Sequence, residues 1–311
     1  MMRCALALFA LAGGCVPWGV ARRPAPVEVP GTSELALRVG DATRTYLLHV
    51  PPRRPRRFGR AESYPLVLVL HGSGAAGQTI RDMSQLDSLA DARALLVAYP
   101  DATRNWLGLQ SGWNAGACCG AAVRNDVDDV GFLRALIEHV AGALPVDRRR
   151  IYVAGFSDGA RMTYRVGCEL SAQVAAIAAV AGSLMVPDCR PQRALPVIAF
   201  HGTADPEVAF DDSAFTAPPR PPAATPVPVP PAVAFWAASN GCRGAELARS
   251  TSSVRRVRYT GCAADVEFFS IEGGGHGWPG DEQDGDDTTP GMRELDASVE
   301  LVRFFLRHPR T

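Results

Sequence analysis

The sequence predicts an α/β fold: a mostly parallel central sheet with helices on both faces, built as a single domain. Short apolar runs, typical of strands buried on both faces of a parallel sheet, alternate along the chain with segments of helical periodicity. The 311 residues are 47% hydrophobic and 21% charged, which excludes a disordered protein. The 32 basic and 32 acidic side chains cancel, whereas nucleic-acid binders normally carry a basic excess, so no nucleic-acid partner is expected.

The expected elements follow one another from residue 35 onward. Residues 35–39 and 43–50, separated by Gly40 and Asp41, have the pattern of a hairpin. The expected strands of the parallel sheet are 65–70, 95–99, 151–154, 175–181, 196–200 and 266–271. The expected helices are 80–92, 128–143, 159–170, 232–239 and 294–306. Residues 217–231 hold eight prolines in fifteen positions, so an extended surface loop is expected there.

The N-terminal segment is expected to direct export. A basic start, an apolar run over 4–12 and small residues after it are typical of a secretory signal peptide, here residues 1–21. An uncleaved membrane anchor is the alternative, but Gly13, Gly14 and Pro17 interrupt the run before the roughly 20 apolar residues that a span needs. We therefore expect a secreted protein, periplasmic or extracellular.

Residues 12–15 (AGGC) also resemble a bacterial lipoprotein cleavage box. In that case Cys15 carries a lipid and tethers the protein to a membrane; the alternative is ordinary cleavage without a lipid. In both cases we expect a proline-rich linker over 22–33 and one catalytic domain over 34–308.

Six cysteines follow the export segment, namely Cys118, Cys119, Cys168, Cys189, Cys242 and Cys262. An even number in an exported chain indicates disulfides, although six cysteines allow fifteen pairings. Loops of moderate length favour Cys168 with Cys189 and Cys242 with Cys262. The adjacent Cys118 and Cys119 then form a vicinal bridge or pair elsewhere. Zinc is the alternative, but no C-x-x-C pair is present, so neither a metal nor another cofactor is expected.

A serine nucleophile is expected at Ser157. Residues 155–159 (GFSDG) follow the strand 151–154 and precede the helix 159–170, the context that a G-x-S-x-G nucleophile elbow requires. The two glycines remove side chains that would clash at the strained turn, and the start of the helix favours negative charge. Because G-x-S-x-G also occurs by chance in glycine-rich chains, the strand before it and the helix after it carry the prediction.

The base and the orienting acid follow in the order typical of α/β hydrolases, Ser, then Asp, then His. Asp205 lies in a loop after the strand 196–200, and His276 lies within a run of glycines after the last strand. We expect Ser157 to attack an ester carbonyl, His276 to take its proton and Asp205 to orient the imidazole. The competing acids, none of which follows a strand and a glycine turn, are Asp188, Asp211 and Asp212.

The oxyanion hole is expected from two backbone N–H groups. Residues 71–74 (HGSG) directly follow the strand 65–70, which is the H-G-x-G position of α/β hydrolases. This position and the residue after the nucleophile each supply one donor, so Ser73 and Asp158 are the expected pair.

These motifs resemble the exported polyhydroxybutyrate depolymerase and feruloyl esterase group of α/β hydrolases, many of them bacterial lipoproteins. The matching motifs are residues 70–72, 113–114, 118–120, 128–132, 155–159, 201–205, 235–236, 240–242 and 274–280, and they span roughly 35 to 307. The resemblance implies carboxylic ester hydrolysis by Ser157, Asp205 and His276. It also implies that Trp113, Trp236 and Trp278 line the acyl cleft, the alternative being that two of them are ordinary core residues.

Three functions remain open from the sequence. The first is a secreted serine esterase for feruloyl-type, acetyl or short hydroxyalkanoate esters. The second is a related serine hydrolase of peptide bonds, for which the sequence has no signal of a side-chain or terminus site. The third is a non-catalytic, envelope-tethered binding protein, which would normally have lost one triad member, whereas all three residues are present.

Overall fold

The structure is a computed structural model that describes residues 28–54, 56–57, 60–104, 111–212, 225, 230–281 and 289–311. The expected signal peptide, Cys15 and the first half of the expected linker, residues 22–27, lie outside the described residues, as does most of the proline-rich segment 217–231. Among the helices that are described, none has both the length and the apolar character needed to cross a membrane.

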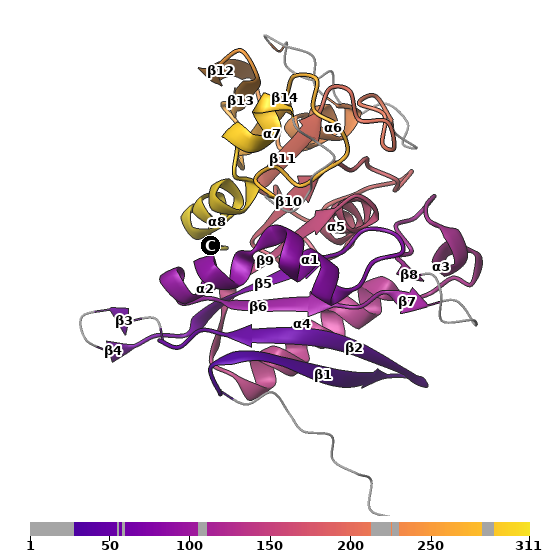
Figure 1. Cartoon of the computed structure of the whole chain (residues 1–311), viewed down its shortest axis with the longest axis vertical. Coiled ribbons are helices and arrows are strands. Elements are labelled where there is room, and N and C mark those ends of the chain that lie inside the picture. The colour runs from indigo at the N-terminus through magenta and orange to yellow at the C-terminus, as the bar shows by residue number, and fades with distance from the viewer. Residues whose placement is uncertain are drawn as a thin grey trace, which may run out of the picture.

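A ten-stranded sheet runs through the molecule in the order β1-β2-β6-β5-β9-β10-β11-β14-β13-β12 (Figure 1). The strands from β6 to β14 in this order are parallel to one another, and the pairs at the two edges are antiparallel. The strand bounds are β1 Gly31–Val39, β2 Ala42–Val50, β5 Tyr64–Leu70, β6 Leu96–Pro100, β9 Val146–Phe156, β10 Ala176–Val180, β11 Val197–Gly202, β12 Gly244–Ser250, β13 Val254–Thr260 and β14 Val266–Ile271. Two small hairpins pair β3 Arg56–Arg57 with β4 Arg60–Ala61, and β7 Thr103–Arg104 with β8 Ser111–Gly112.

The predicted N-terminal hairpin and the predicted parallel strands are confirmed. Strand β12, at the edge of the sheet, and its neighbour β13 were not predicted. Most of β12 is exposed and polar, and the apolar residues of β13 are separated by arginines, so neither segment has the continuous apolar run of a central strand. Edge strands need little burial, which weakens their signal in the sequence.

Helices cover both faces of the sheet, as predicted. Their bounds are α1 Gly77–Ser84, α2 Leu86–Arg93, α3 Gly120–Arg124, α4 Asp129–Ala143, α5 Asp158–Glu169, α6 Pro231–Ser239, α7 Pro290–Glu294 and α8 Ala297–Arg307. The side chains of β5 alternate between the two faces: Leu66, Leu68 and Leu70 pack with α4, α5 and α6, whereas Val67 and Val69 pack with α1, α2 and α8. The expected helix 80–92 is divided into α1 and α2 at Gln85, whose left-handed backbone ends α1.

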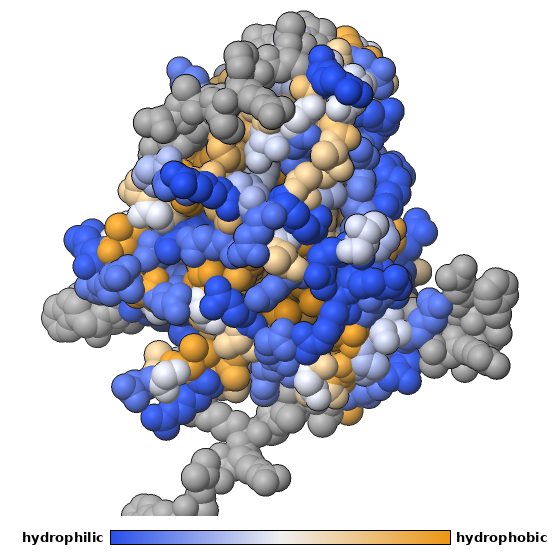
Figure 2. Space-filling model, turned by 180° about the vertical axis from the view of Figure 1, so that it is seen from behind, coloured by the Kyte–Doolittle hydropathy of each residue, from blue (hydrophilic) through white to orange (hydrophobic). Residues whose placement is uncertain are grey.

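Most apolar side chains are buried between the sheet and the helices that cover its two faces. Among the described residues, the exposed large hydrophobic side chains are Val29 and Leu247. Figure 2, which views the molecule from behind, shows a mostly hydrophilic surface with small apolar patches between hydrophilic residues. The sheet and its helices therefore form one continuous scaffold that holds the loops at the strand ends.

Three disulfides join the described cysteines. Cys168 bonds to Cys189 and Cys242 to Cys262, which confirms the two preferred pairs, and Cys118 and Cys119 form the vicinal bridge. The two longer bridges separate their cysteines by 21 and 20 residues. Loops of that size stabilise a folded chain by about 3 kcal/mol each, through restriction of the unfolded chain.

Candidate active site

Ser157 lies on the turn between the end of β9 and the start of α5. Its φ is 56° and its ψ is −117°, a conformation that is strained for a residue with a side chain. The Ser157 N–H donates to the carbonyl of Val180 at 3.0 Å, which holds this turn against β10. A Cβ on Gly159 would overlap the carbonyl oxygens of Leu70 and His71, so only glycine allows α5 to pack this closely on the end of β5.

Three residues from distant parts of the chain meet at this turn. The Nε2 atom of His276 lies 2.9 Å from Oγ of Ser157, and its Nδ1 atom lies 2.9 Å and 3.1 Å from the two carboxylate oxygens of Asp205. The loops that carry them follow β9, β11 and β14, and these strands end at the same edge of the parallel sheet. The arrangement allows His276 to accept the hydroxyl proton of Ser157 while its other nitrogen donates to Asp205.

The carboxylate of Asp205 is held in place by its own loop. Its Oδ1 atom accepts hydrogen bonds from the N–H groups of Glu207 and Val208, both at 2.9 Å. Burial acts to raise the pKa of Asp205, but hydrogen bonds from His276 and from these N–H groups outweigh burial and hold the pKa below its usual value. A lowered pKa favours the ionised form of Asp205 beside the ring of His276.

His201 supports the same loop. Its Nε2 atom donates to the carbonyl of Val208 at 2.9 Å and lies 3.5 Å from Oδ2 of Asp205. Burial lowers the pKa of His201, which favours a neutral ring that donates from Nε2. His201 therefore helps to hold the loop that carries Asp205 in place.

The H-G-x-G segment lies directly against Ser157. A Cβ on Gly72 would approach Cβ of Ser157 to 3.3 Å. His71 anchors the segment: its Nδ1 donates to the carbonyl of Gly72 at 2.7 Å, and its Nε2 accepts from the N–H of Ala102 at 3.0 Å. Burial lowers the pKa of His71, consistent with this neutral tautomer.

The two residues expected to form the oxyanion hole lie on either side of Ser157. Ser73 lines the same pocket as Ser157, and Asp158 begins α5. The side chain of Ser73 hydrogen-bonds to the carboxylate of Asp158, which also accepts from the N–H of Trp113 at 2.9 Å. Burial raises the pKa of Asp158 to about 6, against these hydrogen bonds and the charge of Arg161.

A pocket of about 590 Å³ opens above Ser157 and His276. Its apolar wall is formed by Ile80, Met83 and Phe156, and its acidic lining residues are Asp82, Glu207 and Asp281. No arginine is among the described residues that line it. The Oε2 atom of Glu207 lies 3.6 Å from Nε2 of His276, so this carboxylate stands at the mouth of the reacting centre.

The prediction that three tryptophans line the cleft is wrong. Trp113, Trp236 and Trp278 are at most 2% exposed, and none of them lines the pocket. The indole N–H of Trp113 donates to the carbonyl of His71 at 2.9 Å, so this ring supports the H-G-x-G segment from behind. Trp236 lies in the core, and Trp278 donates to Ser298 on α8.

Two of the three apolar wall residues come instead from α1, for which the sequence predicted a helix but no place in the pocket. Ile80 and Met83 are three residues apart and therefore share one helical face, which here faces the nucleophile. The position of this helix directly after the H-G-x-G segment was the available signal. Glu207 was also not predicted as a pocket residue, although it lies only two residues after Asp205.

Comparisons with known proteins agree with this architecture. A family model described as esterase PHB depolymerase matches residues 45–227. A protein of Nocardia uniformis subsp. tsuyamanensis named as an esterase, NocK, is 34% identical over 277 residues, covering 82% of this chain and 76% of that protein. Feruloyl esterase B of Piromyces equi is 31% identical over 229 residues, covering 71% of this chain and 41% of that longer protein.

The fold has a counterpart among solved structures. The acetyl xylan esterase of Aspergillus awamori superposes with a TM-score of 0.54 at 14% sequence identity, covering 79% of this chain and 95% of that one. At this identity the likeness concerns the fold alone, and it confirms the predicted α/β-hydrolase fold. From the family match and the extent of the similarity to NocK, the chain belongs to the esterase family described by the PHB depolymerase model.

Proposed function

We propose that this protein is an exported serine carboxylic ester hydrolase that works through an acyl-enzyme. One observation carries the proposal: His276 lies within hydrogen-bond distance of both Ser157 and Asp205, at 2.9 Å on each side. Ser157 attacks the ester carbonyl carbon while His276 takes its proton, and the C–O bond to the alcohol breaks as His276 returns the proton to it. Water then releases the acid from Ser157 by the same two proton transfers.

The negative charge of the tetrahedral intermediate needs donors close to Ser157. The backbone N–H groups of Ser73 and Asp158 are the proposed pair, and their side chains are hydrogen-bonded to each other. Loss of one such donor typically lowers kcat by 10²- to 10³-fold. The start of α5 adds a favourable dipole at the same point.

The lining of the pocket supports a neutral ester as substrate. A volume of about 590 Å³ accommodates a small molecule. Glu207 is 70% exposed and stands next to His276, and Asp82 and Asp281 add two further acidic side chains to the lining. An anionic substrate is repelled by this lining, so we propose feruloyl-type esters over hydroxybutyrate oligomers, which carry a terminal carboxylate.

Export is supported by the disulfides. Bridges such as Cys168–Cys189 and Cys242–Cys262 persist in an oxidising compartment. We propose a periplasmic or extracellular location with the signal peptide over residues 1–21. Mass spectrometry of the mature N-terminus distinguishes ordinary cleavage from a lipid on Cys15.

Turnover of p-nitrophenyl acetate and butyrate by the wild type and by Ser157→Ala tests the reaction. We expect a loss of about 10⁵-fold or more in kcat for the variant, because the nucleophile is gone. Equal, slow hydrolysis by both proteins would reject both ester and peptide-bond hydrolysis through Ser157 and leave the non-catalytic binding protein.

The substrate class is tested by methyl ferulate against a hydroxybutyrate dimer. The wild type is expected to have the higher kcat/KM for methyl ferulate. Glu207→Gln is expected to improve kcat/KM for the dimer about two- to fivefold at low salt, since one repelling charge is removed, and to leave methyl ferulate unchanged. If the wild type hydrolyses neither substrate at a measurable rate, this choice of substrate is rejected.

A further inference from the structure

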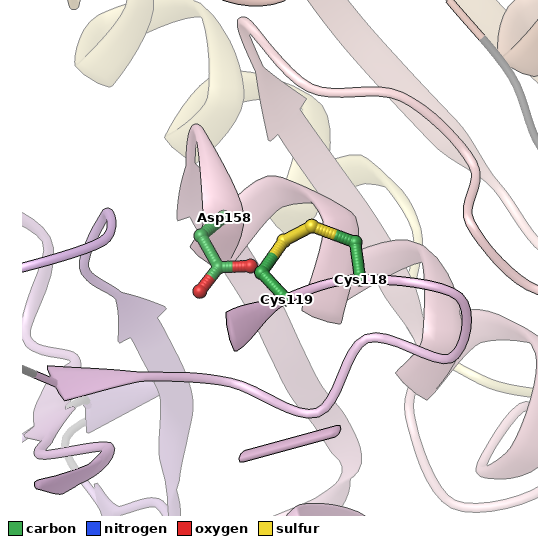
Figure 3. A group of neighbouring side chains, drawn as sticks. All are labelled: Cys118, Cys119 and Asp158. Atoms are coloured by element: carbon green, nitrogen blue, oxygen red, sulfur yellow. A yellow bond between two sulfur atoms is a disulfide. The ribbon is translucent and has the colours of Figure 1, made fainter. Parts of the chain in front are cut away.

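The vicinal disulfide lies beside a buried carboxylate. The sulfur atoms of Cys118 and Cys119 and one carboxylate oxygen of Asp158 all lie within 4.8 Å of one another. Figure 3 shows the disulfide, from the segment just before α3, facing the carboxylate of Asp158 at the start of α5. Thiolates and carboxylates are the side chains that bind zinc-class cations.

Within the described part of the chain, one carboxylate oxygen of Asp158 lacks a hydrogen-bond partner, although the carboxylate accepts from the side chain of Ser73 as well as from the backbone. Its side chain is 0% exposed, and its Oδ2 atom accepts from the N–H of Trp113. Its Oδ1 atom is buried and has no hydrogen-bond partner among the described residues. A buried carboxylate oxygen without a partner is unfavourable, and a cation bound beside it would remove that cost.

The charges around the cluster match a divalent cation. The Nη1 atom of Arg161 lies 3.4 Å and 3.5 Å from the sulfurs of Cys118 and Cys119. A neighbouring guanidinium stabilises thiolates, the form that binds metal. Two thiolates and one carboxylate carry three negative charges, of which a divalent cation balances two. Arg161, which also forms an ion pair with Asp212 at 3.2 Å, lies beside the remaining charge.

Of the three bridges, the vicinal one is also expected to stabilise the fold least. It joins residues that are adjacent in sequence, so it restricts the unfolded chain far less than the bridges that span 21 and 20 residues. Cys119 lines a cavity of about 330 Å³ together with Ser73 and Gly112, so a space of small-molecule size lies next to this bridge. This bond can therefore open while the other two keep the fold.

We propose that reduction of the Cys118–Cys119 bridge by a small dithiol creates a binding site for a thiophilic divalent cation of the zinc class. The dithiol supplies two electrons and two protons, the S–S bond becomes two thiols, and the reductant closes its own disulfide. The cation displaces the two thiol protons to solvent and takes the sulfurs of Cys118 and Cys119 and a carboxylate oxygen of Asp158 as ligands. No metal is expected in the oxidised protein, whose sulfurs are bonded to each other.

Cadmium binding tests the proposal without using ester hydrolysis as its readout. The mature protein, which lacks residues 1–21 and therefore Cys4 and Cys15, is reduced with a dithiol until two thiols per chain are free. Alkylation and mass spectrometry locate these thiols in a portion of the sample, and the reductant is removed without oxygen. Cd²⁺ titration of the remainder should give a cadmium–thiolate charge-transfer band that saturates at one ion per chain. The oxidised protein, and a Cys118→Ser/Cys119→Ser double variant treated in the same way, should give none.

The expected result for Asp158→Asn is the same band with at least tenfold weaker Cd²⁺ affinity. The matched control is Asp126→Asn, an exposed carboxylate in the same segment, which should bind as the wild type does. The proposal is overturned if reduced wild type gives no band, if the double variant gives an equal band, or if the free thiols lie in other bridges while Cys118–Cys119 stays closed. Unchanged affinity in Asp158→Asn would remove the carboxylate from the site and overturn the three-ligand assignment.

Discussion

Two groups of residues in the described part of the molecule combine a hydroxyl, a histidine and a carboxylate at similar distances. In the first, His276 joins Ser157 and Asp205, with 2.9 Å on each side. In the second, the Nδ1 atom of His49 lies 2.9 Å from Oγ1 of Thr32, and its Nε2 atom lies 2.8 Å from Oδ1 of Asp91. The second group joins β1, β2 and α2 and does not include the residues of the catalytic pocket.

The two groups differ in the acceptor to which the hydroxyl donates its proton. The hydroxyl of Thr32 donates to Asp87 at 3.0 Å, so its proton is already used, whereas the hydroxyl of Ser157 has His276 as its acceptor. Burial acts to lower the pKa of His49, but Asp87 and Asp91 outweigh it and raise the pKa. His49 therefore keeps its own proton to higher pH and is less available to accept one from a hydroxyl.

The backbone differs as well. Ser157 stands on a strained turn with φ 56°, and Thr32 lies in the regular strand β1. A matching set of distances is therefore insufficient for catalysis. The hydroxyl proton must point to a neutral imidazole, and the hydroxyl must stand clear of the sheet.

The largest expected effect is on kcat, and it distinguishes the carboxylate of Asp205 from that of Asp91. Asp205→Asn should lower kcat for p-nitrophenyl butyrate by about 10⁴-fold, because the histidine loses its tautomer and the partner for its positive charge. Asp91→Asn makes the same chemical change in the other group and should leave kcat within about twofold. A loss below about tenfold for Asp205→Asn would reject the proposed role of this residue.

The second largest expected effect is on kcat/KM and concerns the strained turn at Ser157. In Gly159→Ala the new Cβ meets backbone oxygens of Leu70 and His71, so the start of α5 must shift away from the H-G-x-G segment. We expect kcat/KM to fall by about 10²-fold, since small displacements of reacting groups are costly. Gly142→Ala on α4 meets no atom within 4 Å and is the control. It should keep full activity and raise the free energy of unfolding by roughly 0.5–1 kcal/mol. Full activity in both variants would show that close packing at this turn is unnecessary.

The smallest effect is on stability and concerns His49. Because its pKa is raised in the folded state, its ion pairs stabilise the fold fully below the unfolded pKa of about 6.5. That stability is lost as the pH rises through the higher folded pKa. His49→Gln should therefore lower the free energy of unfolding by about 1–2 kcal/mol at pH 6 and by less at pH 9. Urea unfolding at both pH values measures this, and a difference that grows with pH would contradict the ion pairs. Ester turnover should be unchanged.

The sequence predicted the parts of the site that depend on local structure. A strand, the motif at residues 155–159 and a helix specify a turn of known shape, and the carboxyl ends of parallel strands bring Asp205 and His276 to one edge. Both disulfide pairs followed from loop length. The position of each of these features is set by its immediate neighbours or by the sheet.

The features that escaped prediction depend on packing between distant segments. Trp113 is adjacent to motif residues, but whether its ring faces the cleft or supports His71 from behind depends on how β8 packs on the site. Similarly, Thr32 and His49 pair only because β1 lies antiparallel to β2 in one register. The sequence alone does not indicate which contacts each of these side chains makes in the folded protein.

The most direct test of the central claim is covalent labelling by a small organophosphate, followed by intact-mass measurement and peptide mapping. A serine whose proton is removed by a neighbouring imidazole attacks the phosphorus and retains it. We predict one adduct per chain, located on Ser157, which persists in Thr32→Ala and is absent from Ser157→Ala. A wild-type protein that stays unlabelled, or an adduct that remains after Ser157 is replaced, would contradict the claim that Ser157, His276 and Asp205 form the reacting centre.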